Sequence, residues 1–190
     1  MVSGFRREFE QALRLIGEAF ADLKAQDKPI PVIVGGAAVE FYTGGMITTG
    51  DFDFVSADQP AIETALEKVG FRREHRAGHS MRGLYHPDLN IGAEVVSSRL
   101  LDGAADITHT TEVTTSPGGA FVASSRWKDM IADRLGQYCS TPRGVLEMLD
   151  QAIALWRFAQ RKQIDEAYLD KRIRHETAGD WSLDRLKSQA

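Results

Sequence analysis

Two aspartates one residue apart are the side chains of this sequence most able to do chemistry. Asp51 and Asp53 stand in the segment TTGDFDFV, residues 48–55. Because side chains alternate along a strand, both carboxylates would share one face while Phe52 and Phe54 enter a core. Adjacent carboxylates repel each other unless a divalent cation lies between them. The pattern predicts a Mg²⁺ or Mn²⁺ site, with a solvated strand face or an Asp-capped turn as the alternative.

A Gly-Gly pair lies upstream, where the apolar run 32–34 ends. Glycine lets the backbone approach a ligand closely, and the N–H groups at a helix start favour an anion such as phosphate. Gly35 and Gly36 therefore predict a phosphate-binding turn, although glycine pairs also make plain turns. The stretch has neither the Gly-Lys-Ser/Thr of a Walker A loop nor the third glycine of a Rossmann fingerprint.

A third carboxylate is expected on a neighbouring strand, which the sequence predicts at 90–97. Glu94 is a lone acid in this apolar segment, and such an acid needs a partner. It would bind a shared metal ion and accept the proton of an attacking hydroxyl. An exposed glutamate on an edge strand is the alternative. Asp88 competes for this role, but it follows Pro87 and is typical of a turn.

Hydrophobic periodicity and the Gly/Pro positions predict the elements that hold these residues. Gly44 and Gly45 would end the second helix, and Ser56 or Asp58 would cap the third. The expected order is helix 5–25, strand 32–34, helix 36–42, strand 51–55, helix 61–69, strands 71–74, 81–85 and 90–97, a hairpin of 113–115 and 120–123, and helices 127–138, 145–161 and 164–175.

This order predicts an α+β fold with two parts. Residues 1–125 would form a mixed β-sheet flanked by helices. Residues 126–190 would form a C-terminal helical region packed on that core. The length allows a real hydrophobic core without disulfide bonds.

Composition narrows the classes of protein that fit. A net charge of −4 over 190 residues provides no global basic field for nucleic acid. Cys139 is the only cysteine, which excludes an internal disulfide and a multi-cysteine zinc site. No segment has the roughly 20 apolar residues that span a bilayer, and no signal-peptide pattern is present, so we expect a cytoplasmic protein without a membrane partner. His75, His79 and His86 are expected on the surface rather than in a metal cluster.

The motifs together resemble a known family. Gly-Gly, a short helix, Thr-x-Asp-x-Asp and a single acid on a later strand resemble the nucleotidyltransferase superfamily with the DNA polymerase β-type core. The stretch SSRWKDMIADRL, residues 124–135, is similar to the branch related to AbiEii abortive-infection toxins and minimal nucleotidyltransferases. The resemblance covers residues 30–160 and implies a nucleotidyltransferase-like fold.

The resemblance also implies roles for the motif residues. Gly35 and Gly36 would hold the triphosphate of an NTP, next to Thr49 of the motif. Asp51 and Asp53 would bind two divalent ions, and these two acids with Glu94 would form the catalytic and metal-binding set. The third acid of the family is commonly Asp, and Glu reaches one carbon further. In toxin relatives a basic residue on the first tail helix reaches the phosphates; Lys128 and Arg134 are the candidates here, and Arg134 is favoured.

The implied activity is that of a metal-dependent nucleotidyltransferase. It would transfer a nucleoside monophosphate from an NTP to an acceptor hydroxyl on RNA, protein or a small molecule, and release pyrophosphate. The implied setting is a toxin of a toxin–antitoxin or phage-defence pair, with a cognate antitoxin as partner. Two alternatives stay open: a non-catalytic nucleotide-binding or partner-binding module, and a glycosyltransferase whose Asp-x-Asp binds Mn²⁺ and a nucleotide sugar. The short N-terminal half argues against the latter.

Overall fold

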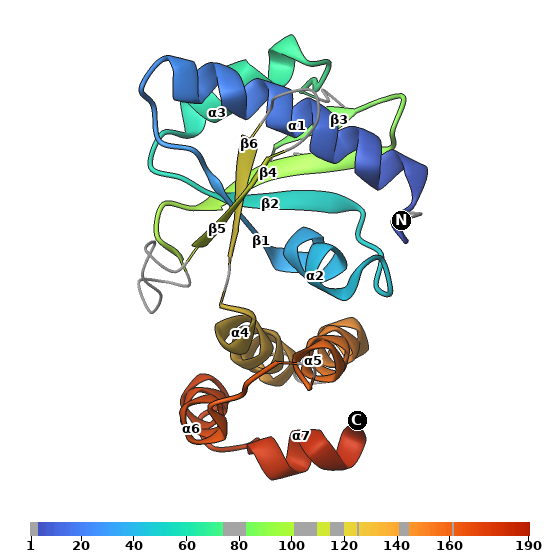
Figure 1. The fold of residues 1–190 in the computed structure, drawn as a ribbon, viewed down its shortest axis with the longest axis vertical. Helices are drawn as coiled ribbons and strands as arrows, with labels where there is room; N and C mark the ends of the chain where they lie inside the picture. The colour runs from blue at the N-terminus through green and yellow to red at the C-terminus, as the bar shows by residue number, and fades with distance from the viewer. Residues whose placement is uncertain are drawn as a thin grey trace.

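The protein has an α+β fold in which a mixed sheet lies above a group of helices (Figure 1). The computed structural model describes residues 4–73, 83–100, 110–114, 120–124, 126–140, 145–160 and 162–190. The elements are α1 (Arg7–Ala25), β1 (Val32–Val34), α2 (Gly35–Thr43), β2 (Asp51–Val55), α3 (Gln59–Lys68), β3 (Leu84–His86), β4 (Ile91–Ser97), β5 (Thr110–Thr114), β6 (Ala120–Ser124), α4 (Trp127–Cys139), α5 (Leu146–Ala159), α6 (Glu166–Glu176) and α7 (Leu183–Gln189). The predicted fold class is confirmed.

Within the described residues, the sheet has six strands in the order β3-β4-β2-β1-β6-β5. β2 pairs in parallel with β4 and antiparallel with β1, and β1 pairs in parallel with β6. The outer pairs, β3 with β4 and β5 with β6, are antiparallel. β1 and β2 therefore lie at the centre of the sheet, where both neighbours fix the position of every residue.

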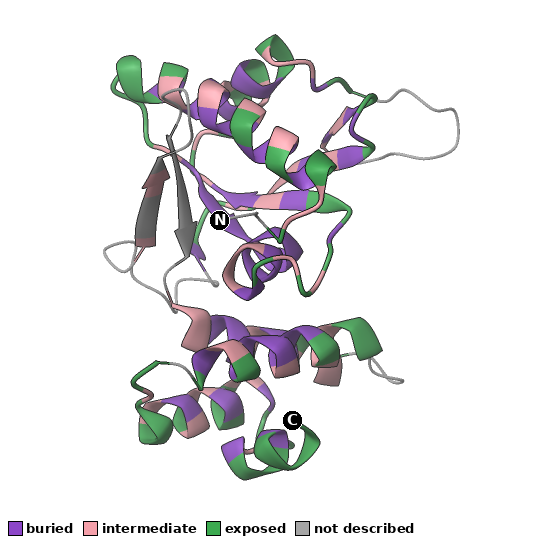
Figure 2. Cartoon of the chain, turned by 45° about the vertical axis from the view of Figure 1, so that its right-hand side comes forward, coloured by how far each residue is buried: buried purple, intermediate pink, exposed green. Residues whose placement is uncertain are grey.

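The residues of β2 alternate between the core and the opposite face of the sheet. Phe52 and Phe54 are fully buried, and their rings contact Phe9 and Phe20 of α1 at centroid distances of 5.1 and 5.2 Å. Burial of each such ring contributes about 1.5–3 kcal/mol. α1 and α3 cover this face, with their buried sides turned to the sheet (Figure 2). The aspartates of β2 must therefore project from the other face.

α2 follows β1 without a linker, and two glycines allow its sharp start and end. Gly35 has φ +63° at the strand-to-helix turn, and Gly44 has φ +68° at the C-terminus. Both values lie in the left-handed region that glycine adopts at little cost. Residues 35–40 are all buried, and α2 packs between the sheet and α5. Asp58, one of the two expected caps, accepts a hydrogen bond from the Ala61 N–H at the start of α3.

The helices of the C-terminal region pack around α4, which contacts both α5 and α6. Asp129 of α4 is fully buried and pairs with Arg172 at 3.0 Å, while the Tyr168 hydroxyl donates to it at 2.6 Å. This region has one helix more than the sequence predicted. α7 begins at Leu183, after the N-cap Ser182, whose hydroxyl accepts from the Arg185 N–H. Its seven residues are too few for a clear apolar period.

Three local expectations differ from the structure. At the described residues 71–73 of the strand expected at 71–74, the structure has a single bridge between Arg72 and Tyr85, and Phe71 is buried in the core. β3 begins at Leu84, and the predicted loop with His75 and His79 lies in 74–82, outside the described residues. His86 is buried against the Phe71 ring, so its predicted surface position is wrong. Among the described residues, no helix combines the length and the apolar character needed to cross a bilayer.

Candidate active site

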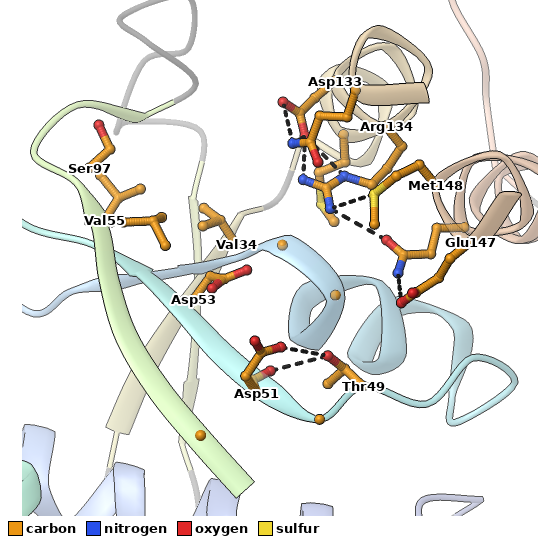
Figure 3. Close-up of a pocket in the computed structure, with 18 of the residues that line it drawn as sticks. Val34, Thr49, Asp51, Asp53, Val55, Ser97, Asp133, Arg134, Glu147 and Met148 are labelled. Carbon is orange, nitrogen blue, oxygen red and sulfur yellow. Dashed lines mark hydrogen bonds and ion pairs between the residues drawn. The ribbon is translucent and has the colours of Figure 1, made fainter. Parts of the chain in front are cut away.

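A pocket of about 790 Å³ lies between helices α4 and α5 and the face of the sheet opposite α1 and α3 (Figure 3). Two groups of residues line it from opposite sides. The sheet wall comprises Gly35, Gly36, Thr49, Asp51 and Asp53. The helical wall comprises Asp133, Arg134, Glu147, Met148 and Gln151. Segments that are far apart in the sequence thus meet at one concave surface of mixed polar and apolar residues.

The two aspartates of the sheet wall share an unfavourable electrostatic environment. Asp51 is exposed, whereas Asp53 is half-buried beside Val34 of β1. Burial, and then the charge of Asp51, raise the pKa of Asp53 to about 6; Arg134 opposes the rise, and Glu94 adds to it. Carboxylates that repel each other in this way bind a hard divalent cation readily. The donor set therefore fits Mg²⁺ or Mn²⁺.

The two glycines make room for the acidic strand. A Cβ on Gly35 would fall on the Asp53 Oδ2, and a Cβ on Gly36 would lie 2.6 Å from the Thr49 Oγ1. Any side chain at either position would push the motif residues away from the start of α2. The glycines therefore have a packing reason to be present, in addition to the close phosphate approach that the sequence predicts.

Thr49 holds the first aspartate in place. Its hydroxyl lies 3.2 Å from both the backbone oxygen and the Oδ1 of Asp51. Its backbone N–H donates to the fully buried carboxylate of Glu40, at 2.7 Å. The carboxylate of Asp51 thus has a fixed neighbour on the sheet wall, as the dashed lines in Figure 3 show.

Glu94 stands next to the aspartate pair in the sheet without lining the pocket. The parallel register of β2 and β4 places Glu94 beside Asp53. Gly83 lies close to the Glu94 side chain, because a Cβ added at Gly83 would be 3.0 Å from the Glu94 Cβ. Within the ranges that the structure describes, no group of three or more His, Cys, Asp or Glu side chains is placed to hold a metal ion. The predicted three-carboxylate set is therefore adjacent in register but not assembled as a cluster.

The two basic candidates of α4 lie in different surroundings. Arg134 is nearly buried, donates to the Asp133 Oδ2 at 3.0 and 2.6 Å, and lies 3.4 Å from the Gln151 Oε1. Its charge reaches Asp53 across the pocket. Lys128 does not line the pocket; its ammonium lies over the rings of Trp127 and Tyr168, at 5.8 and 5.7 Å from their centroids. The structure thus brings Arg134, and not Lys128, to the aspartates.

Sequence reasoning missed the amide groups of Gln137 and Gln151 and the carboxylate of Glu147 in the surroundings of Arg134. Asp133 accepts from Gln137 as well as from Arg134, and Glu147 accepts from Gln151 at 3.1 Å. The Asp133–Gln137 and Glu147–Gln151 pairs are spaced i,i+4 on a helix, which is also the spacing of ordinary solvated pairs. The one available signal for these groups was Gln151, a long polar side chain within the largely apolar helix α5. Glu40 was missed because it looked like the polar position of a short helix.

Comparisons with known proteins show the fold. No family model and no curated protein matches the sequence. The chain is similar in structure to the antibiotic-resistance factor ANT(2'')-Ia, known from a solution structure, with a TM-score of 0.54 and 15% sequence identity. The match covers 88% of this chain and 90% of that one. A likeness at this identity confirms a nucleotidyltransferase-like fold over nearly the whole chain.

Proposed function

We propose that the protein is a metal-dependent nucleotidyltransferase that transfers a nucleoside monophosphate from an NTP to an acceptor hydroxyl. The observation behind the proposal is the pair Asp51 and Asp53 on one pocket wall, beside the Gly35–Gly36 turn and opposite Arg134. The fold neighbour ANT(2'')-Ia is an aminoglycoside nucleotidyltransferase, which supports the same class of reaction.

Each group of the pocket has a role in this reaction. Asp51 and Asp53 would hold divalent ions, which neutralise the phosphates and polarise the attacked phosphorus. The N–H groups at the start of α2 would bind the triphosphate, and Gly36 would allow its close approach. The Arg134 guanidinium would bind phosphate oxygens and exchange part of its pairing with Asp133 for them. Glu94, beside Asp53 in register, would complete the metal site after a side-chain movement.

The acceptor is proposed to be a small cationic molecule that bears a hydroxyl. The helical wall holds two carboxylates, Asp133 and Glu147, against one guanidinium, so its formal charge is −1. An anionic RNA strand would be repelled by such a wall, whereas ammonium groups would pair with it. That ANT(2'')-Ia acts on aminoglycosides agrees with this choice. A toxin role, with RNA or protein as acceptor and a cognate antitoxin, stays a prediction from the sequence resemblance.

The experiment pairs binding with turnover. Calorimetry with a non-hydrolysable NTP analogue is run with and without Mg²⁺ or Mn²⁺, and the double variant Asp51→Asn/Asp53→Asn is the comparison. Labelled NTPs are then incubated with aminoglycosides, polyamine alcohols, total RNA and lysate protein. We expect metal-dependent binding that the double variant loses, and label transfer to a cationic small molecule. Binding without any transfer would favour the non-catalytic alternative, and UDP-sugars in the same screen test the glycosyltransferase alternative.

A further inference from the structure

The first described residues of the chain are packed tightly against the loop that leads into the aspartate motif. A Cβ on Gly4 would lie 2.6 Å from the Gly44 backbone oxygen, and one on Gly45 would lie 2.5 Å from the Gly4 oxygen. The Phe5 ring stacks on Phe41 of α2 at a centroid distance of 6.3 Å. The backbone before α1 and the turn after α2 therefore meet without side chains between them.

An ion pair between the half-buried Arg6 and the fully buried Glu40 continues this contact toward the pocket. The Arg6 Nε donates to the Glu40 Oε1 at 3.3 Å, and its Nη2 donates to the backbone oxygen of Thr49. The Glu40 Oε2 accepts the Thr49 N–H at 2.7 Å. Both backbone polar groups of Thr49 are thus bound by one Arg–Glu pair, and its hydroxyl is left to contact Asp51.

Such a pair is expensive for a structural role alone. The Glu40 side chain is 0% exposed, and removing a carboxylate from water costs several kcal/mol. Well-packed apolar residues in its place often give equal or greater stability. What the ion pair gives instead is a defined direction for the Thr49 backbone, two residues before the first aspartate.

We infer that Arg6, Glu40 and Thr49 form a positioning network that sets the Asp51 carboxylate for metal binding. The inference rests on the proposed function, since it assigns the network to that metal site. Arg6 and Glu40 act through Thr49, and the Thr49 hydroxyl acts on Asp51 directly. Residues before α1 thereby become part of the site, although they are far from Asp51 in the sequence.

Four variants test the network. Thr49→Val keeps the shape and both backbone bonds but removes the hydroxyl, and Thr49→Ser restores the hydroxyl. Glu40→Gln keeps the shape but presents an amide to Arg6. Asp129→Asn is the matched control, because Asp129 is also a fully buried, arginine-paired acid but does not line the pocket.

Two readouts are measured on the full chain. Mn²⁺ binding, followed by electron paramagnetic resonance, should weaken about tenfold in Thr49→Val and Glu40→Gln and stay within about twofold of wild type in Thr49→Ser and Asp129→Asn. Hydrogen exchange of amides 44–50 in metal-free protein should speed up about tenfold or more in Glu40→Gln and stay unchanged in Asp129→Asn.

The outcomes separate the inference from the proposed function. If the wild type binds Mn²⁺ and both Thr49→Val and Glu40→Gln bind it equally well, the network is only structural and the inference is overturned. If Asp129→Asn weakens binding as much, a general loss of stability is the cause, which also overturns it. If the wild type binds no Mn²⁺, the proposed function fails first and the inference falls with it.

Discussion

The two walls of the pocket are built in different ways. The sheet wall consists of residues at the start of α2, on β2 and in the loop before β2. It is held by the pairing of β2 with its neighbours and by phenylalanine rings on the opposite face of the sheet. The helical wall is held together by side chains that bond to one another, from Asp133 through Arg134 to Gln151 and Glu147. Backbone pairing leaves little freedom, whereas side-chain bonds can exchange partners with a ligand. We infer that the sheet wall fixes the chemistry and that the helical wall adapts to substrates.

Removal of an aspartate should give the largest effect on the reaction rate, and it tests whether the sheet wall fixes the chemistry. Asp53→Asn is expected to lower the rate of nucleotide transfer roughly a thousandfold, because metal-based stabilisation of the transition state is worth several kcal/mol. The rate is measured with labelled NTP at saturating metal. The variant should keep its circular dichroism spectrum, and wild-type activity in a folded Asp53→Asn protein would rule out the assigned role.

Arg134→Gln tests whether the helical wall binds phosphate. We expect the KM for the NTP to rise about 30-fold, because a charge-assisted bond to phosphate is lost and Asp133 loses its partner. Steady-state kinetics with varied NTP measures this. Lys128→Ala serves for comparison on the same helix and should change the KM less than twofold, since that ammonium lies on two aromatic rings. The reverse order of effects would move the phosphate site to Lys128.

The stability of metal-free protein should depend on pH through Asp53. The folded pKa of about 6 lies above the unfolded value of 3.8, so the folded state holds a proton longer. The stabilisation that the protonated Asp53 gives the folded state is fully present below pH 4 and is lost as the pH rises through 6. The loss is about 1–2 kcal/mol, because partial exposure of the carboxylate weakens the full effect of the shift. Urea unfolding at pH 4.5 and 7.5 in EDTA measures it, and Asp53→Asn should flatten the difference.

Glu147→Gln should give the smallest effect and sharpens the assignment of the acceptor side. An exposed carboxylate that meets an ammonium is worth about 0.5–1 kcal/mol, so the KM for a cationic acceptor should rise about two- to fivefold. The KM for the NTP should stay unchanged. Glu10→Gln, an exposed acid on α1 outside the pocket, is the control. An equal rise in both KM values would assign Glu147 to nucleotide binding instead.

The sheet wall could be predicted because local rules decide it. Alternation in DFDFV places Asp51 and Asp53 on one face whenever Phe52 and Phe54 are buried, and the glycines mark the turn before α2. The same rules found α1 and the Asp58 cap. Each of these features depends on residues that are only a few positions apart in the sequence.

Apart from Arg134, which the family resemblance indicated, the helical wall could not be predicted, and neither could the Glu40 network, because long-range packing decides them. Asp133 with Gln137, and Glu147 with Gln151, have the spacing of solvated helix pairs. Only the packing of α4 and α5 against α2 makes the two acids line a pocket. Glu40 is buried because α2 lies between the sheet and α5, which no local pattern shows. The buried position of His86 was missed for the same reason.

The alternation of side chains along β2 also means that a one-residue shift in its register would disrupt both faces of the sheet. A slip by one residue would place both phenylalanines in the pocket and both carboxylates against Phe9 and Phe20. A chain shifted by one residue would lose its core and its chemistry together. Insertions that lengthen the loop at 44–50 should therefore be repaired by bulging of the loop, and a chain that folds at all would present its aspartates on the correct side.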